Sequence, residues 1–233
     1  MTEFTTWRSL VDGAEISAIP DSAVSQLRLA EGSGTSVSNE FDGQPDATLN
    51  GEFWTSNNYE GGFALDFQGT DELDFDDTFD FAAVGEQFSF AVTIDFSAIT
   101  DEEVIWHQRP IDDDIVTVGW TRDEDEDGIG IGTFDGSFQI EEGSDNTPTG
   151  RARLGIAIDR VNQVAEIYWD GVQDTTTSGN RPPMSGDTNE NAMGYQPGNN
   201  KYIQDGVLDN PIWYNELLSQ SEFESDYNSQ PWV

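Results

Sequence analysis

The chain has 233 residues, a length typical of one large β domain or two small ones. Its 46 acidic and 9 basic residues give a formal net charge of −37, which argues against a nucleic-acid partner because no basic stripe exists to meet phosphates. The absence of cysteine excludes disulfides and thiolate metal sites. The single histidine, His107, argues against a histidine zinc site or a Ser-His-Asp relay, and we expect it on the surface of a strand. No apolar stretch is long enough to predict a membrane span.

The acidic residues are spread between aromatic and aliphatic residues, which favours a folded protein over a disordered acidic tail. At low ionic strength such a charge destabilises the compact state by self-repulsion. In about 1 M salt the Debye length falls to about 3 Å and most of this repulsion is screened. The composition therefore predicts a protein made for high salt, from a halophilic organism or from a virus of one.

Residues 1–20 are predicted to form an N-terminal arm that precedes the domain at residues 21–233. Phe4 and Trp7 are three residues apart, a spacing that suits a strip docked either on the domain itself or on a neighbouring subunit. Together with Trp232 near the other end, they are candidate assembly contacts. The start of the chain lacks a basic end followed by an apolar core, so we expect no Sec signal peptide.

Alternating apolar and polar residues predict strands through most of the domain. A short strand is expected at Leu27 and Leu29, followed by a loop rich in turn-forming residues at 36–50. In residues 61–75, GGFALDFQGTDELDF, two strands are separated by a turn at 69–71, and we predict a small hairpin. Residues 88–96 show the clearest alternation, with aromatic and aliphatic side chains on one face and small polar ones on the other.

The remaining elements follow as an antiparallel meander and a closing strand with a helix. The meander is predicted at residues 104–108, 115–121, 128–133 and 138–142. A hairpin with strands at 154–158 and 165–169 precedes a polar loop at 174–200, and a strand follows at 207–214. Ser219 and Glu222 have the spacing of a capping box, which predicts a short helix ending near Tyr227. The fold class is therefore all-β: a two-sheet antiparallel jelly-roll sandwich with a short C-terminal helix.

Five segments in this order resemble the laminin-G-like, concanavalin A-like jelly-roll family. They are RLAEGSGTSVSNEFDGQPDATLNG, the 61–75 segment, EQFSFAVTIDF, AEIYWDGVQD and DGVLDNPIWYNELLSQSEF. The resemblance implies a binding or adhesion module for glycans or proteins, often with one calcium ion between the early loop and the closing strand. Carried onto this sequence, that ion would have Asn39, Asp42, Asp46 and Asp209 as ligands, whose oxygens suit calcium. The alternative is that these residues are ordinary turn and strand-end residues. One departure is that the Trp-His pair of the family is Arg151-Ala152-Arg153 here.

Aromatic residues in predicted loops are candidate contacts for a sugar ring, with the alternative that they cover the core. They are Trp54, Tyr59, Tyr195 and Tyr202.

Two acidic motifs imitate sites of other proteins. Residues 123–128 (DEDEDG) imitate the start of an EF-hand loop, but the twelfth position is Phe134 and the flanks are predicted strands, so we expect a solvated hairpin tip. Glu72 and Asp74 with Asp76 and Asp77 resemble the carboxylate cluster of laminarinase-type glycoside hydrolases, with Asp77 where that motif ends in Glu. The alternative is an ordinary structural strand, which the laminin-G-like pattern places at this position.

The function predicted from these observations is non-enzymatic binding or assembly at an exterior surface. We expect a virion structural protein of a haloarchaeal virus, such as a tail fibre, spike, turret or capsid decoration, located on the virion in high salt. Its expected partners are other virion proteins or further copies of itself, as a homo-oligomer, and a host-surface glycan or glycoprotein. A carbohydrate-binding lectin of a halophilic archaeon is the alternative, and a glycoside hydrolase is a third reading.

Overall fold

A computed structural model describes residues 22–230 with gaps at residues 28, 30, 42, 45, 52–53, 57–62, 70, 76–86, 97–103, 111–114, 124–125, 135–137, 142–147, 149, 160, 179–187, 197–200 and 204–205. The predicted arm and Trp232 lie outside the described residues. No helix in the described part of the chain has the length and hydropathy needed to cross a membrane.

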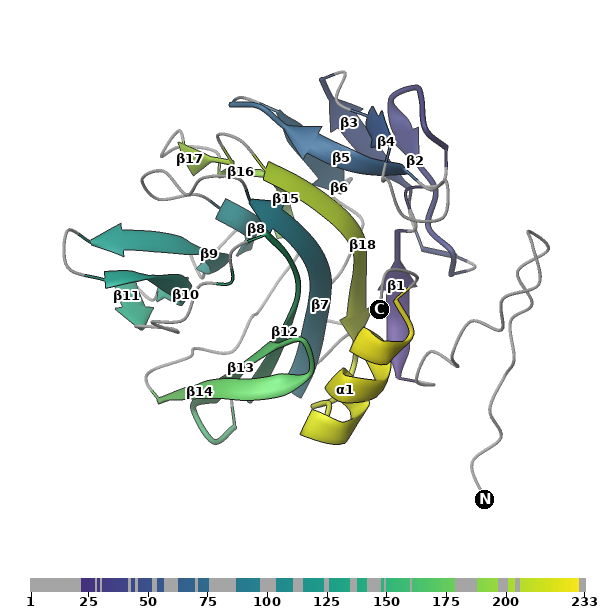
Figure 1. The fold of residues 1–233 in the computed structure, drawn as a ribbon. Coiled ribbons are helices and arrows are strands. Elements are labelled where there is room, and N and C mark those ends of the chain that lie inside the picture. The colour runs from purple at the N-terminus through teal and green to yellow at the C-terminus, as the bar shows by residue number, and fades with distance from the viewer. Residues whose placement is uncertain are drawn as a thin grey trace.

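Two antiparallel sheets stack on each other, as the alternating sequence predicted (Figure 1). The helix-bearing sheet has the order β14-β13-β12-β7-β18-β5-β4, with β1 also beside β18. Its strands are β1 (Ala23–Gln26), β4 (Trp54–Ser56), β5 (Phe63–Phe67), β7 (Gln87–Phe96), β12 (Gly150–Asp159), β13 (Val164–Trp169), β14 (Val172–Ser178) and β18 (Gly206–Tyr214).

The meander sheet has the order β11-β10-β9-β8-β15-β6-β3-β2. Its strands are β2 (Ser36–Val37), β3 (Ala47–Asn50), β6 (Glu72–Phe75), β8 (Val104–Pro110), β9 (Ile115–Asp123), β10 (Glu126–Phe134), β11 (Phe138–Glu141) and β15 (Thr188–Met193). A separate two-stranded ribbon joins β16 (Tyr195–Gln196) to β17 (Lys201–Tyr202), and the helix is α1 (Gln220–Asn228).

The main core lies between the sheets and is centred on aromatic rings from both. Trp106 of the meander sheet lies 5.3 Å from Phe90 and 6.3 Å from Trp213 between ring centroids, and both of these belong to the helix-bearing sheet. Phe75 meets Trp213 edge-on at 5.0 Å. Tilted and edge-to-face contacts of this kind add to the stabilisation from burial. The rings therefore fix the distance and register of the two layers.

A second, smaller core lies on the outer face of the helix-bearing sheet. Alternation along β7 and β12 sends Ala91 and Ala157 away from the main core, toward Tyr168 and Phe223. Phe223 belongs to α1, which lies on the side of the arc of β7, β12 and β18 that faces away from β9–β11 (Figure 1). The helix begins at the predicted capping box, with Ser219 and Glu222 bonded reciprocally. The part of the outer face that packs against α1 is thus covered rather than solvated.

The predicted hairpin at 61–75 is wrong in its pairing, although both strands exist. β5 pairs with β4 and β18 in the helix-bearing sheet, whereas β6 pairs with β3 and β15 in the meander sheet. The connection therefore crosses between layers. Gly69, at φ +83°, donates its N–H to the carbonyl of Ile203 at 3.0 Å, and the N–H of Gln68 bonds the Asp71 carboxylate at 2.9 Å. Alternation along the sequence predicts that a segment forms a strand, but not which strand it pairs with, because pairing depends on residues far away in the sequence.

Three further expectations need correction. Part of the expected loop at 36–50 is strand, in β2 and β3, and part of the expected loop at 174–200 is strand, in β14 to β16. His107 is buried, with 1% of its surface exposed, rather than lying on a strand surface. Its strand β8 lies in the interior of the meander sheet, between β9 and β15, rather than at an exposed edge. The meander itself, β8 to β11, is confirmed.

Candidate functional site

The early-loop residues of the predicted calcium site lie together. The backbone N–H of Asn39 donates to the Asp46 carboxylate at 3.0 Å. The side-chain oxygen of Asn39 accepts from the N–H groups of Phe41 (3.1 Å) and Gln26 (3.4 Å), and its amide nitrogen donates to Ser25. Asp42 lies outside the described residues. Asn39 thus organises the loop through its own hydrogen bonds.

Asp209 approaches the same region from the closing strand but is bonded to an arginine. Its Oδ2 lies 2.6 Å from Nη2 of Arg151, and both side chains are about nine-tenths buried. Burial raises the pKa of Asp209, and the positive charges of Arg151 and Arg153 partly oppose this shift. Amide side chains connect this part of the closing strand to the early loop. Gln26, whose backbone N–H bonds Asn39, donates from Nε2 to Oδ1 of Asn210 at 2.7 Å.

These two halves do not by themselves complete a calcium site. Calcium needs six to eight oxygen ligands, and the oxygens of Asn39 and Asp209 already bind N–H groups and a guanidinium. Among the described residues, no group of three or more acidic, histidine or cysteine side chains is placed to hold a metal ion. Calcium therefore stays a prediction that depends on Asp42 and on rearrangement at Asp209.

The predicted aromatic contacts fall in two places. Trp54 is half-buried on β4, packs against the main core and donates its indole N–H to the Gly34 carbonyl at 2.8 Å. Tyr195 and Tyr202 are direct register partners across the β16–β17 ribbon, here called the tyrosine ribbon. Tyr59 lies outside the described residues. Trp54 therefore covers the core, as the alternative reading expected, whereas the structure brings two of the tyrosine positions together.

The tyrosine ribbon is fixed to the body by backbone hydrogen bonds at its base. Gly194 donates to the carbonyl of Ile105 on β8 at 3.1 Å, and Ile203 donates back to Gly194 at 3.0 Å. Gly194 has φ +82°, and a Cβ added there would lie 2.2 Å from the Phe67 ring. Only glycine satisfies both the conformation and the close approach. The ribbon is thus held at a defined position relative to the two sheets.

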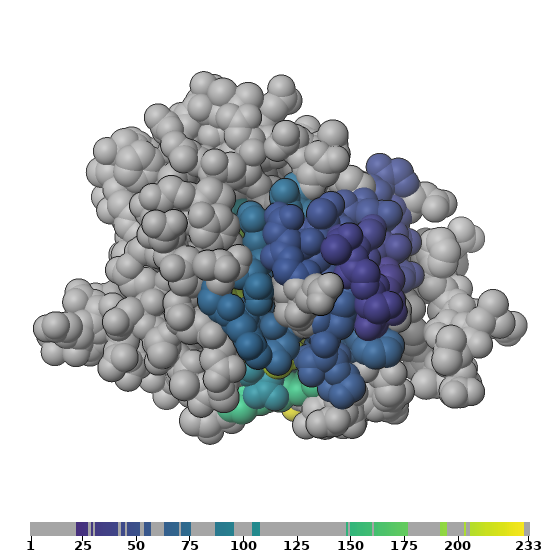
Figure 2. Space-filling model, turned by 90° about the horizontal axis from the view of Figure 1, so that it is seen from above, coloured from purple at the N-terminus to yellow at the C-terminus, as the bar shows by residue number. Residues whose placement is uncertain are grey.

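A glycine-rich strap at residues 32–35 joins the edges of the two sheets. Gly34 receives the Trp54 indole bond from the helix-bearing sheet, and the carbonyl of Thr35 accepts from Leu49 of the meander sheet at 2.8 Å. Gly32, at φ +66°, packs directly on the Phe63 ring. From above, the described surface at this end is formed mainly by the N-terminal third of the chain (Figure 2).

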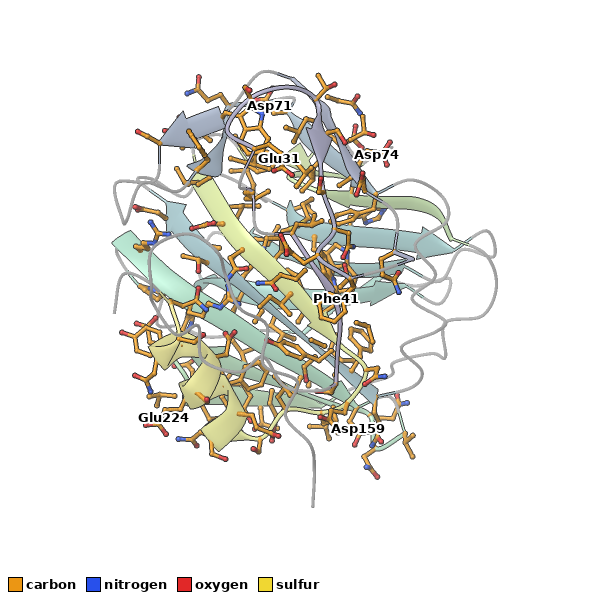
Figure 3. The ribbon with its side chains drawn as sticks, turned by 90° about the vertical axis from the view of Figure 1, so that its right-hand side faces the viewer. Glu31, Phe41, Asp71, Asp74, Asp159 and Glu224 are labelled. Carbon is orange, nitrogen blue, oxygen red and sulfur yellow. The ribbon has the colours of Figure 1, made fainter. Side chains whose placement is uncertain are left out.

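Carboxylates surround this end of the sandwich. Glu31, Asp71 and Asp74 all lie there (Figure 3). Glu72 and Asp74 alternate with buried Leu73 and Phe75, so they point outward from β6, and Asn50 donates to Glu72 at 3.2 Å. Asp77 of the hydrolase-like pattern lies outside the described residues.

The EF-hand-like motif forms a hairpin tip, as expected. Asp123 and Glu126 are register partners at the ends of β9 and β10, and residues 124–125 between them lie outside the described residues. The flanking strands differ from the helices that flank an EF-hand loop.

The most elaborate polar site was not predicted. Arg153, 2% exposed, forms a bidentate pair with Asp226 of α1 at 2.7 and 3.1 Å. Its remaining amino group bonds the Asn210 carbonyl at 2.7 Å and Thr93 at 3.2 Å, and Tyr214 donates to Asp226 at 3.2 Å. Burial opposes the charge on Arg153, but Asp226 outweighs it and raises the pKa of the guanidinium. We call this set the arginine clamp.

The arginine clamp sits at a bulge in β18, where the register shifts between Asp209 and Ile212. Asn210 has φ +49° there and also donates to Gln230 beyond α1 at 3.1 Å. A sequence signal existed, since Arg151 and Arg153 alternate with apolar residues in a chain that has only nine basic residues.

Known structures share this fold. Domain 4 of AbnA, a GH43 extracellular arabinanase from Geobacillus stearothermophilus in complex with arabinotriose, matches with a TM-score of 0.64 and 14% identity over 89% of this chain and 98% of that one. Trypanosoma rangeli sialidase in complex with sialic acid matches at 0.63 and 14% identity, but over only 34% of its own length against 91% of this chain. The receptor-binding domain of a botulinum neurotoxin C/D mosaic serotype matches at 0.64 and 13% identity over 90% of this chain and 52% of that one.

Comparisons with protein-family models and with curated proteins found no match. At these identities the solved structures establish a shared β-sandwich fold. The laminin-G-like assignment stays a resemblance.

Proposed function

We propose that the chain is a non-enzymatic carbohydrate-binding module that works at an exterior surface in high salt. The observation that carries the proposal is the correspondence with domain 4 of the arabinanase, which extends over nearly the full length of both chains and whose structure holds arabinotriose. The sialidase and the neurotoxin domain, in contrast, exceed this chain in length. The part of the arabinanase that this chain matches over nearly its full length is thus a single sandwich domain in complex with a sugar, which supports a carbohydrate-binding role here.

Within this proposal the tyrosine ribbon is the sugar contact. Its two tyrosines occupy paired positions, and the ribbon is anchored to β8 through Gly194 and to the turn at Gly69 through Ile203. Aromatic rings with a polar tip suit sugars, which present an apolar face and a rim of hydroxyls. A fixed base lowers the ordering cost on binding. The expected ligand is an oligosaccharide.

A glycan array in about 1 M KCl, where surface repulsion is screened, tests this proposal. The double variant Tyr195→Ala/Tyr202→Ala should lose at least about tenfold in affinity for the best glycan, as expected when aromatic anchors are truncated. Tyr227→Ala, on α1, is the matched control and should bind like the unaltered chain. An array without any bound glycan, or equal binding by the double variant, contradicts the proposal.

The exterior assembly is proposed to be a virion of a haloarchaeal virus, with the chain as a tail fibre, spike, turret or capsid decoration that contacts other virion proteins or its own copies. The net charge of −37 supports a high-salt habitat. Mass spectrometry of purified particles tests this part, and absence of the chain from them would end it. The alternative source is a lectin carried by a halophilic archaeon itself.

A glycoside hydrolase is the competing class, because Glu72 and Asp74 both point outward from one strand and the known structures with this fold include sialidase and arabinanase chains. If hydrolysis of a bound glycan is detected in about 1 M salt, the double variant Glu72→Gln/Asp74→Asn decides the matter. Loss of hydrolysis with binding retained would replace the binding-module proposal by an enzyme. Unchanged hydrolysis would place the activity elsewhere.

A further inference from the structure

Helix α1 is an acidic element that lies on an acidic surface. Its sequence, QSEFESDYN, has three acidic residues and no basic one. The turn at Asp170 and Gly171 touches it, since a Cβ added to Gly171 would lie 2.4 Å from the Glu224 Cα. Asp170 precedes Gly171 in this turn, and burial and the negative charge of Asp170 raise the pKa of Tyr227 on α1.

Further acids of the sheet face the same helix. Glu166 accepts the hydroxyl of Tyr168 at 2.7 Å, and Tyr168 stacks on Phe223 of α1 at 4.4 Å between ring centroids. Asp209 lies beside the arginine clamp and is paired with Arg151. Among the described residues, Arg153 is the basic group bonded to the helix. The acids around the helix therefore outnumber the bases.

Two kinds of force thus act on α1, and salt affects them differently. Repulsion between exposed acids reaches about 10 Å at 0.1 M salt and about 3 Å at 1 M. The buried Arg153–Asp226 pair and the Phe223 contact are screened much less, because water and ions are excluded from them. Lowering the salt therefore adds repulsion without adding attraction.

We infer that α1 is a salt-dependent latch, which stays docked in molar salt and leaves the sheet before the sandwich unfolds when salt is lowered. The backbone ladders β7–β12 and β7–β18 hold the sheet without the helix. Release of α1 would uncover the outer core, including Tyr168, Ile212 and Tyr214. The latch is a property of the fold, and its test does not depend on the ligand of the proposed function.

Hydrogen exchange of the full chain, followed by mass spectrometry along a KCl series from about 1 M to about 0.1 M, tests the latch. The amides of α1 should lose half of their protection at a higher salt concentration than the amides of β7 and β12. At an intermediate concentration they should exchange at least about tenfold faster than in 1 M salt, while the strands stay protected. The inference is overturned if α1 and the strands β7 and β12 lose protection at the same salt concentration, or if the exchange of the α1 amides does not depend on salt.

Charge variants separate a local effect from total charge. Asp170→Asn/Glu224→Gln neutralises two acids at the helix, and Asn at 170 tolerates φ +52° and can still accept the Arg153 N–H. This variant should move the release of α1 to lower salt. The control Asp66→Asn/Asp71→Asn removes the same charge away from the helix and should leave the release unchanged. An equal shift in both variants would show a total-charge effect and would contradict the latch.

Discussion

Removing the acid of the arginine clamp provides the sharpest test of the packing described above. In Asp226→Ala, Arg153 would remain 2% exposed with only the Asn210 carbonyl and Thr93 as partners. Breaking a buried ion pair at one side typically costs about 3–5 kcal/mol, because an uncompensated charge is left inside. With a urea slope of about 2.5 kcal/mol per molar, a loss of about 4 kcal/mol lowers the unfolding midpoint by about 1.6 M.

The assay is urea unfolding at about 1 M KCl, followed by tryptophan fluorescence, since screening keeps α1 docked at that salt. Two variants complete the design. Glu224→Ala, an exposed acid on the same helix, should change the midpoint by less than about 0.4 M. Arg153→Met/Asp226→Leu removes both charges and should recover most of the loss, because buried pairs are often replaced by apolar side chains without cost. A double variant as unstable as Asp226→Ala would refute the account of the clamp as a charge pair.

Four further outcomes are expected. Gly155→Ala should destabilise the fold by about 1–3 kcal/mol in urea unfolding, since its Cβ would lie 2.5 Å from the Phe223 ring. Ser219→Ala should cost about 1 kcal/mol through loss of the capping box. Burial and Asp226 raise the pKa of Tyr214 well above its usual range. The neutral hydroxyl therefore stabilises the fold fully below about pH 10, and this stabilisation is lost as the pH rises toward the folded-state pKa. Melting temperatures measured from about pH 8 to 12 should fall for this reason, and they should fall less in Tyr214→Phe. If calcium binds at the early loop, a chelator at constant salt should lower the melting temperature, and an unchanged melt with no bound metal would remove that prediction.

Local sequence patterns predicted the elements whose two faces differ. The alternation of β7 placed Phe88 and Phe90 in the main core, and Ser219 with Glu222 marked the start of α1. The small polar residues on the other face of β7 indicated a solvent-exposed surface, but Ser89 and Thr93 on that face are buried. That face is covered by a helix far along the chain, which a period-two pattern cannot reveal.

The errors share this non-local origin. β14 (VQDTTTS) and β15 (TNENAM) carry no apolar alternation in their sequences, so no strand was predicted there. β14 lies at a sheet edge, and Ala192 and Met193 at the end of β15 are buried. Arg153 finds its partner 73 residues later, so nothing beside it in the sequence indicates burial. Of the candidate site, the pairing of Tyr195 with Tyr202 required the register of a ribbon, which residue type alone did not supply.

The position of β18 has a consequence for biosynthesis. This strand lies between β7 and β5 and is the last strand of the described chain, so a ribosome makes both neighbours long before it. Until it emerges, β5 and β7 present open edges and the aromatic side chains of β7 lack Trp213. The nascent chain is therefore expected to remain an aggregation-prone intermediate until translation has passed Tyr214, and a product truncated before that residue should be a substrate for chaperones and proteases rather than a smaller sandwich.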